Sequence, residues 1–218
     1  MKDGWLRHIK KMISILNKFE LVRKNISGWH GKDLTLLDVG CRGCELREYI
    51  KDLVQYRGVD LFQNSEGSVD FVLDVEKGLP MPDESYDFVA ALDLVEHLND
   101  FQGGLEELLR VTRKCLLVVL PNLAHTVHRK EFFLRGRLFT GKYDLKYNNG
   151  IDRHRWLTVI PQTDEYMRRF ADDKKVHLEI LWFNTGIKMA LFEKIGRFLR
   201  LSPSWWVGSS LYILTKEK

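Results

Sequence analysis

The sequence has few cysteines and no long apolar run. It contains three cysteines and five prolines in 218 residues, which excludes a small secreted scaffold held by disulfides. The longest apolar stretch is the six residues from Cys115 to Leu120, whereas a membrane-spanning helix needs about 20. The first residues carry scattered charges and no apolar signal core. These absences predict a cytoplasmic protein.

A strong charge of one sign is also absent. The net charge is +4, which lacks the basic excess of a protein that follows nucleic-acid phosphates, so a nucleic-acid partner is not favoured. With 44% hydrophobic residues the chain can bury a substantial core. We expect one domain over 1–218, divided into an N-terminal helical segment (1–32), a cofactor-binding half (33–122), a substrate lid insertion (123–175) and C-terminal strands with a helix (176–218).

The most informative stretch is an apolar strand that runs into a glycine turn. Thr35–Val39 is the strand, Gly40 and Gly43 lack a Cβ where the chain must turn and a ligand must approach, and a helix is expected over Glu45–Leu53. The turn does not spell the Gly-x-Gly-x-x-Gly of dinucleotide folds. Asp38 at the strand end favours a cofactor that carries an ammonium group rather than phosphates.

Further strands and acids follow at regular intervals. The second strand ends at Asp60, 22 residues after Asp38, which is the spacing at which a βαβ unit brings a carboxylate to ribose hydroxyls. Later strands are expected over Phe71–Val75, Phe88–Leu92 and Cys115–Leu120, with a helix over Phe101–Lys114. Alternating strands and helices predict an α/β fold with a parallel sheet covered on both faces.

Three motifs in this order carry a family resemblance. They are Asp38-x-Gly40-Cys41, the segment Leu79–Val89 with its Leu-Pro-x-Pro-Asp-x-Ser-Tyr-Asp pattern, and Val95-Glu96-His97-Leu98. Over roughly Leu36–Asn122 the chain resembles the class I S-adenosylmethionine-dependent methyltransferases. The resemblance implies a doubly wound, mostly parallel, seven-stranded Rossmann-like sheet with an antiparallel last strand, an N-terminal helix and a lid insertion after strand 5.

The resemblance also implies S-adenosylmethionine as cofactor and a set of residues that bind it. Asp60 would hold the ribose, and Asp74 and Val75 would lie against the adenine. The full implied set is Asp38, Gly40, Cys41, Arg42, Gly43, Asp60, Leu61, Asp74, Val75, Asp93 and Leu94.

The glycine turn departs from the family pattern, which reads Asp-x-Gly-Cys-Gly-x-Gly. Arg42 and Cys44 stand where the family has glycines. This departure leaves open a methyltransferase-like binding or regulatory domain without turnover, and an NAD-linked oxidoreductase is a third hypothesis. Cys41 and Cys44 also form a Cys-x-x-Cys at a helix start, which permits redox chemistry, but a packed tight turn is the favoured interpretation.

The segments outside these motifs suggest where an acceptor binds. Residues 123–175 interleave cations with aromatics, and His154 lies in a lead-in similar to the family's His-x-Phe/Trp-x-Thr, before a lid helix expected over Pro161–Phe170. Strands are expected over Val176–Phe183 and Ser210–Thr215, with a helix over Gly186–Leu199. Met1–Ser27 predicts a basic amphipathic helix, which favours packing on the domain and leaves peripheral membrane contact open.

Methyl transfer to a hydroxyl or an amine requires removal of a proton. We rank His154 first and His97 second as the catalytic base, and expect methylation of a small or lipid-linked acceptor, at oxygen, by a monomer or homodimer. No metal is expected. One option is a site formed by Asp93, Glu96 and His97, with His125 or His154 as a fourth ligand, because these residues are similar to the Glu-x-x-Glu-His cluster of ubiquinone-biosynthesis and small-RNA 2′-O-methyltransferases.

Overall fold

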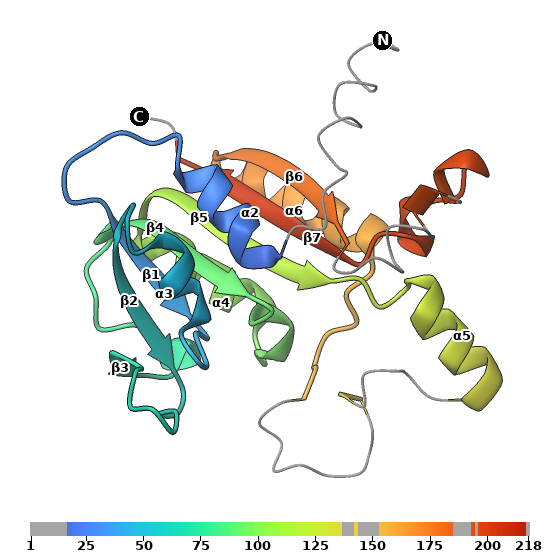
Figure 1. Ribbon diagram of the computed structural model, residues 1–218, viewed down its shortest axis with the longest axis horizontal. Coiled ribbons are helices and arrows are strands. Elements are labelled where there is room, and N and C mark those ends of the chain that lie inside the picture. Colours follow the sequence, from blue (N-terminus) through green and yellow to red (C-terminus); the bar gives the residue numbers. More distant parts are fainter. Residues whose placement is uncertain (1–16, 137–141, 144–152, 185–192, 195, 217–218) are drawn as a thin grey trace.

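A computed structural model describes residues 17–136, 142–143, 153–184, 193–194 and 196–216. These residues form one seven-stranded sheet in the order β3-β2-β1-β4-β5-β7-β6 (Figure 1). Strands β1 to β5 pair in parallel, and β7 runs antiparallel to both β5 and β6. The predicted α/β class and antiparallel last strand are confirmed. The strands are β1 Thr35–Val39, β2 Gln55–Asp60, β3 Phe71–Val72, β4 Tyr86–Leu92, β5 Thr112–Pro121, β6 His177–Phe183 and β7 Ser209–Thr215.

Helices cover both faces of the sheet because its central strands are apolar on both sides. On one face α4 (Phe101–Val111) and α6 (Ile160–Lys174) pack on a core that includes Leu37 and Val118. On the other face α2 (Lys18–Ile26) and α3 (Glu45–Ile50) pack on a core that includes Leu36. Consecutive residues of a strand therefore supply opposite cores, as the two-residue period requires.

Several element boundaries differ from the prediction. The helix α3 ends at Ile50, earlier than expected, and β3 has two residues instead of the predicted Phe71–Val75. The strand stops because the Asp74 side chain accepts the main-chain N–H of Glu76 at 3.1 Å and begins a short 3-10 helix, η1 (Val75–Lys77). The expected helix over Gly186–Leu199 lies largely outside the described residues, as does 1–16 of the N-terminal segment.

The helix expected over Pro161–Phe170 is α6. The helix α6 packs on the sheet, where Met167 and Phe170 lie in the main core. Its apolar face is therefore buried against strands, and the role of residues 123–175 as a substrate lid stays a prediction.

A different helix leaves the body of the molecule after β5. This helix, α5 (Thr126–Arg135), has no buried residue and projects beyond the sheet, as the yellow-green helix in Figure 1 shows. Residues 137–141 and 144–152 of the expected lid lie outside the described part of the chain. Within the described residues, none of the helices has the length and apolar character needed to cross a membrane.

Candidate functional site

The sheet order reverses at the boundary between β1 and β4, and this is where ligands bind in open α/β sheets. Gly40 follows β1, and Asp93 follows the neighbouring β4. Asp60 ends β2 on the other side of β1. Because these strands are parallel, their carboxyl ends meet at one edge, which brings the three predicted residues together.

Two features of the local geometry require a glycine at position 40. Its φ of 76° is in the left-handed region, and its N–H donates to the carbonyl of Val59 at 2.8 Å. A Cβ added here would lie 2.9 Å from a methyl carbon of Leu94. The loops after β1 and β4 therefore approach each other as closely as a residue without a side chain permits.

Arg42 and Cys44, which stand where the family turn has glycines, adopt a backbone conformation that is typical of glycine. Arg42 has φ 47° and Cys44 has φ 57°, whereas Gly43 is not in the left-handed region. Besides Gly40, the left-handed positions of the turn are thus the two neighbours of Gly43. Cys41 and Cys44 are both buried with their sulfur atoms 3.4 Å apart, and burial raises the pKa of the Cys41 thiol.

Asp60 joins the turn to the loop after β2. Its Oδ2 accepts the main-chain N–H of Arg42 at 2.8 Å, and the Asn64 amide donates to the Arg42 carbonyl at 2.8 Å. Leu61, the next predicted residue, exposes 45% of its surface, and Phe62 exposes 51%. The edge of the sheet thus offers a half-buried carboxylate beside two exposed apolar side chains, a fitting surface for a ribose and an adenine.

Asp38 lies in the interior rather than on the open edge. It is 4% exposed, and its Oδ2 accepts the hydroxyl of Tyr56 at 2.8 Å. Burial raises the pKa of the Asp38 carboxyl to about 7, against the opposing effects of the Tyr56 hydrogen bond and the Lys18 charge. Sequence reasoning missed Tyr56, since nothing in its spacing indicates that its hydroxyl reaches the neighbouring strand.

Asp93 is engaged by the N-terminal helix. It has φ 60°, and its Oδ2 forms an ion pair of 2.7 Å with the ammonium of Lys18 at the start of α2. Lys18 is a site residue that sequence reasoning missed, because its charge was one of many in a basic segment.

Asp74 and Val75 have structural roles in the described chain. Asp74 begins the 3-10 helix η1 and forms an ion pair of 3.4 Å with Lys77. Val75 is 7% exposed and belongs to the main core. The structure therefore leaves Asp74 the more accessible of the two to a ligand.

The two predicted histidines meet beside Glu96. The rings of His97 and His154 are edge to face with centroids 4.6 Å apart, and ligand atoms of Glu96, His97 and His154 all lie within 4.8 Å of one another. The strand-like segment of His154 is held there because the N–H of Arg155 donates to the Glu96 carbonyl at 2.9 Å. Among the described residues this group includes neither Asp93 nor His125, so the metal option foreseen as Asp93, Glu96 and His97 has a different third member.

The carboxylate of the Glu96 side chain has no hydrogen-bond partner in the described structure. It is fully buried, and both of its carboxylate oxygens are unsatisfied. Burial, followed by the nearby Asp93 charge, raises the pKa of Glu96 to about 8. Such a group is costly unless a proton or a cation accompanies it.

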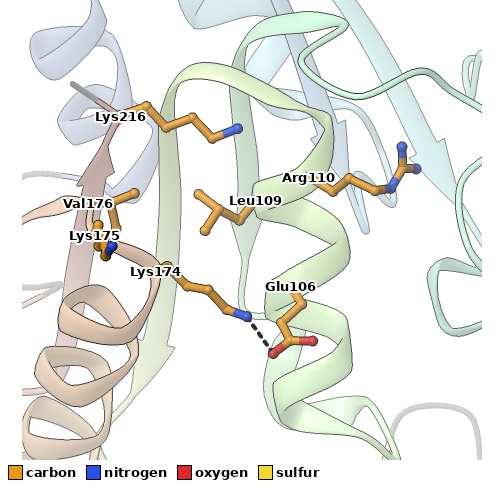
Figure 2. Close-up of a pocket in the computed structure, with 7 residues that line it drawn as sticks. All are labelled: Glu106, Leu109, Arg110, Lys174, Lys175, Val176 and Lys216. Atoms are coloured by element: carbon orange, nitrogen blue, oxygen red, sulfur yellow. Dashed lines mark hydrogen bonds and ion pairs between the residues drawn. The ribbon is translucent and has the colours of Figure 1, made fainter. Parts of the chain in front are cut away.

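A separate pocket of about 380 Å³ lies between α4, the end of α6 and the end of β7 (Figure 2). It is at the amino edge of the parallel strands, opposite the site above. Three of its four cations have acidic partners: Lys174 pairs with Glu106 at 2.8 Å, Lys216 with Glu84 at 3.1 Å and Arg110 with Asp83 at 2.7 Å. Paired cations are poor anion ligands, so this pocket is not the candidate site.

Comparisons with known proteins concern the fold and the segment from β1 to β5. A family model described as "Methyltransferase domain" matches residues 37–119. No curated protein sequence matches the chain.

Solved structures with the same fold include a SAM-dependent methyltransferase from Archaeoglobus fulgidus, at 17% identity and a TM-score of 0.58, covering 91% of this chain and 94% of the other. Phosphoethanolamine N-methyltransferase 2 from Haemonchus contortus, in complex with S-adenosyl-L-methionine, matches at 15% identity and a TM-score of 0.61, covering 93% of this chain and 53% of the other. A putative methyltransferase of Haloferax volcanii, in complex with the activator Trm112, matches at 16% identity and a TM-score of 0.55, with coverages of 92% and 91%.

The matched residues 37–119 run from β1 into β5 and contain the turn, Asp60, Asp93 and the Glu96-His97 pair. The family model thus places a methyltransferase domain at residues 37–119, and the solved structures show that the chain has the fold of S-adenosylmethionine-dependent methyltransferases.

Proposed function

We propose that this methyltransferase transfers the methyl group of S-adenosylmethionine to an oxygen of a small or lipid-linked acceptor. The observation that carries the proposal is the meeting of His97 and His154 beside Glu96, at the edge of the sheet where the glycine turn after β1 also lies. Methyl transfer from a sulfonium is an in-line displacement, so the protein must orient the acceptor and provide for its proton. Two imidazoles at this edge suit an acceptor hydroxyl.

The cofactor would occupy the turn and the loops after β2 and β4. The proposed contacts are those expected from the family: the main chain of Gly40, Cys41, Arg42 and Gly43 and the side chains of Asp38, Asp60, Leu61, Asp74, Val75, Asp93 and Leu94. The half-buried carboxylate of Asp60, whose Oδ2 already accepts the main-chain N–H of Arg42 in the turn, supports this placement. Asp38 would contribute from the protein interior, because one of its carboxylate oxygens already accepts a hydrogen bond from the Tyr56 hydroxyl.

His154 is our first choice for the group that accepts the acceptor's proton. It is 8% exposed and lies against both His97 and Tyr143, whose ring centroid is 5.3 Å away. A buried imidazole held on two sides keeps one orientation, which is what general-base catalysis requires. His97 is the second choice.

An exposed apolar surface supports a lipid-linked acceptor. Phe133 on α5 is 88% exposed, and near the C-terminal part Phe198 is 87% and Leu199 56% exposed. The two segments are joined, since the Arg129 guanidinium stacks 4.1 Å from the Trp205 ring. Large apolar side chains beside cations are suited to the boundary of an anionic membrane. The alternative of a binding domain without turnover is not favoured.

Calorimetry with S-adenosylmethionine and with S-adenosylhomocysteine tests the cofactor half of the proposal. We expect both to bind, and the absence of heat with either would refute it. Labelled methyl transfer into cell extract, separated into lipid-soluble and water-soluble fractions, tests the acceptor half.

His154→Ala should bind the cofactor normally and transfer label at least about 100-fold more slowly, the usual contribution of a general base. His177→Ala is the matched control because His177 is exposed at the opposite edge of the sheet. Equal rates for the two variants would remove His154 from the catalytic group.

A further inference from the structure

We infer that Glu96, His97 and His154 form a binding site for one divalent transition-metal ion. The inference concerns the same site as the proposed function and gives the three side chains a common ligand. Their ligand atoms come from two segments, the short 3-10 helix η2 (Val95–His97) that follows β4 and the segment before α6, and His97 and His154 are 57 residues apart in sequence. Only the fold brings them together.

The distances suit a single ion after a small adjustment. The three ligand atoms lie within 4.8 Å of one another, while ligands about 2.1 Å from a tetrahedral metal are about 3.4 Å apart. Closing the group on an ion requires each atom to move inward by about 1 Å. Rotation of the side chains can supply this movement, because the main chain of Arg155 already fixes the two segments together at the Glu96 carbonyl.

The burial of Glu96 is the second observation that points to a cation. The side chain is 0% exposed and both oxygens lack a hydrogen-bond partner. A buried carboxylate without compensation costs several kcal/mol, and a coordinated cation removes that cost. Lys18, which also lowers the pKa of Glu96, forms its ion pair with Asp93 and not with Glu96.

The ligand types select the class of metal. Two imidazoles and one carboxylate suit zinc, cobalt, iron or nickel better than magnesium or calcium, which prefer oxygen ligands throughout. Three protein ligands also leave a coordination position open, as in catalytic zinc sites. An acceptor hydroxyl in that position would have a lowered pKa and would lose its proton more readily to solvent or to a nearby base. In the loaded site the imidazoles would then be ligands rather than the base.

Cobalt provides a direct measurement that does not depend on turnover. Tag-free full-length protein is stripped with a chelator, desalted and titrated with Co²⁺ while visible absorption is recorded, and bound metal is counted by mass spectrometry. We expect one equivalent to bind with a d–d spectrum of low coordination number, and excess Zn²⁺ to abolish that spectrum.

Three variants assign the signal to the site. Glu96→Gln keeps the shape of the side chain and removes its charge, so it should fold and should weaken Co²⁺ binding at least about 10-fold. His154→Asn should do the same. The matched control, His177→Ala, should bind like the natural sequence, because His177 is exposed on the edge strand β6.

Absence of a Co²⁺ spectrum in the natural sequence would overturn the inference, and so would undiminished binding in Glu96→Gln. Calorimetry with S-adenosylmethionine on the same samples separates this result from the proposed function. Cofactor binding without metal binding removes only the metal site and leaves His154 as the direct base. Metal binding without cofactor binding leaves the metal site and removes the proposed function.

Discussion

Leu94 and Gly40 decide the shape of the cofactor turn at the residue scale. The close approach of the Leu94 side chain to the Gly40 main chain leaves no room for a Cβ. Arg42 and Cys44, in contrast, carry side chains in a left-handed conformation, which costs each about 1–2 kcal/mol. The turn thus keeps its form at Arg42 and Cys44 without glycine, at a cost in stability.

Gly40→Ala should destabilise the protein by about 1–3 kcal/mol more than Gly67→Ala, the range for overpacking. Both glycines have positive φ, 76° and 65°, but nothing lies within 4 Å of a Cβ built on Gly67. The pair therefore separates backbone strain from the contact with Leu94. Urea unfolding of the two variants is the measurement, and equal losses would show that Leu94 moves aside freely.

Asp38 should make stability depend on pH. Its carboxyl has a pKa of about 7 in the folded protein against an ordinary 3.8, so the folded state holds its proton more tightly than the unfolded state. Stability from this group is complete below about pH 4 and is lost as pH rises through 7. Asp38→Asn removes that loss.

Between about pH 5 and pH 8 the natural sequence should lose more unfolding free energy than Asp38→Asn. The difference between the two losses should be at least roughly 1.4 kcal/mol, the equivalent of one pKa unit. Denaturant titrations at the two pH values measure it. A variant with the unchanged pH dependence would show that the Asp38 carboxyl ionises normally.

At the scale of elements, one buried carboxyl attaches α6 to the sheet. Asp164 on α6 accepts the Tyr212 hydroxyl of β7 at 2.8 Å and the Trp182 indole N–H of β6 at 3.1 Å. Tyr212 is fully buried. These two hydrogen bonds to neighbouring strands help to hold α6 flat on the sheet, where its apolar contacts are also made.

Asp164→Ala should destabilise the protein by about 2–4 kcal/mol, because the Tyr212 hydroxyl and the Trp182 N–H lose their acceptor in the interior. Asp173→Ala on the same helix is the control, since Asp173 is exposed and its loss should cost less than about 0.5 kcal/mol. Thermal and urea unfolding compare the two, and a small effect at Asp164 would mean that water reaches these groups.

For the whole molecule, the proposed cofactor site joins loops that follow three different strands. Their contacts, from Arg42 to Asp60 and from Gly40 to Leu94, are already formed without a ligand. A ligand that contacts all of them should stabilise the folded state as a unit, by about 2.7 kcal/mol at a concentration 100 times its Kd.

S-adenosylhomocysteine should therefore raise the Tm in proportion to the logarithm of its concentration. Asp60→Ala should weaken binding by about 1–3 kcal/mol through the loss of charge-assisted hydrogen bonds, and should shift the same curve to higher ligand concentration. Glu66→Ala is the control, because Glu66 is exposed in the same loop. Identical curves for the two variants would place the ribose elsewhere.

The sequence by itself determined the order of strands and helices and the class of cofactor. Short apolar runs such as Thr35–Val39 and the glycine after them are local signals, so they were predicted with boundaries close to those observed. The end of β3 at Val72 was not, because it depends on how the Asp74 side chain bonds to its own main chain.

Only the tertiary structure decided which side chains share the site. Asp38 and Tyr56 meet across neighbouring strands, and Lys18 reaches Asp93 from a helix 75 residues away in sequence. Glu96 and His154 meet because the chain returns to the end of β4 after α5. No local pattern encodes these contacts, since each depends on sheet order and on the packing of segments that are distant in the chain.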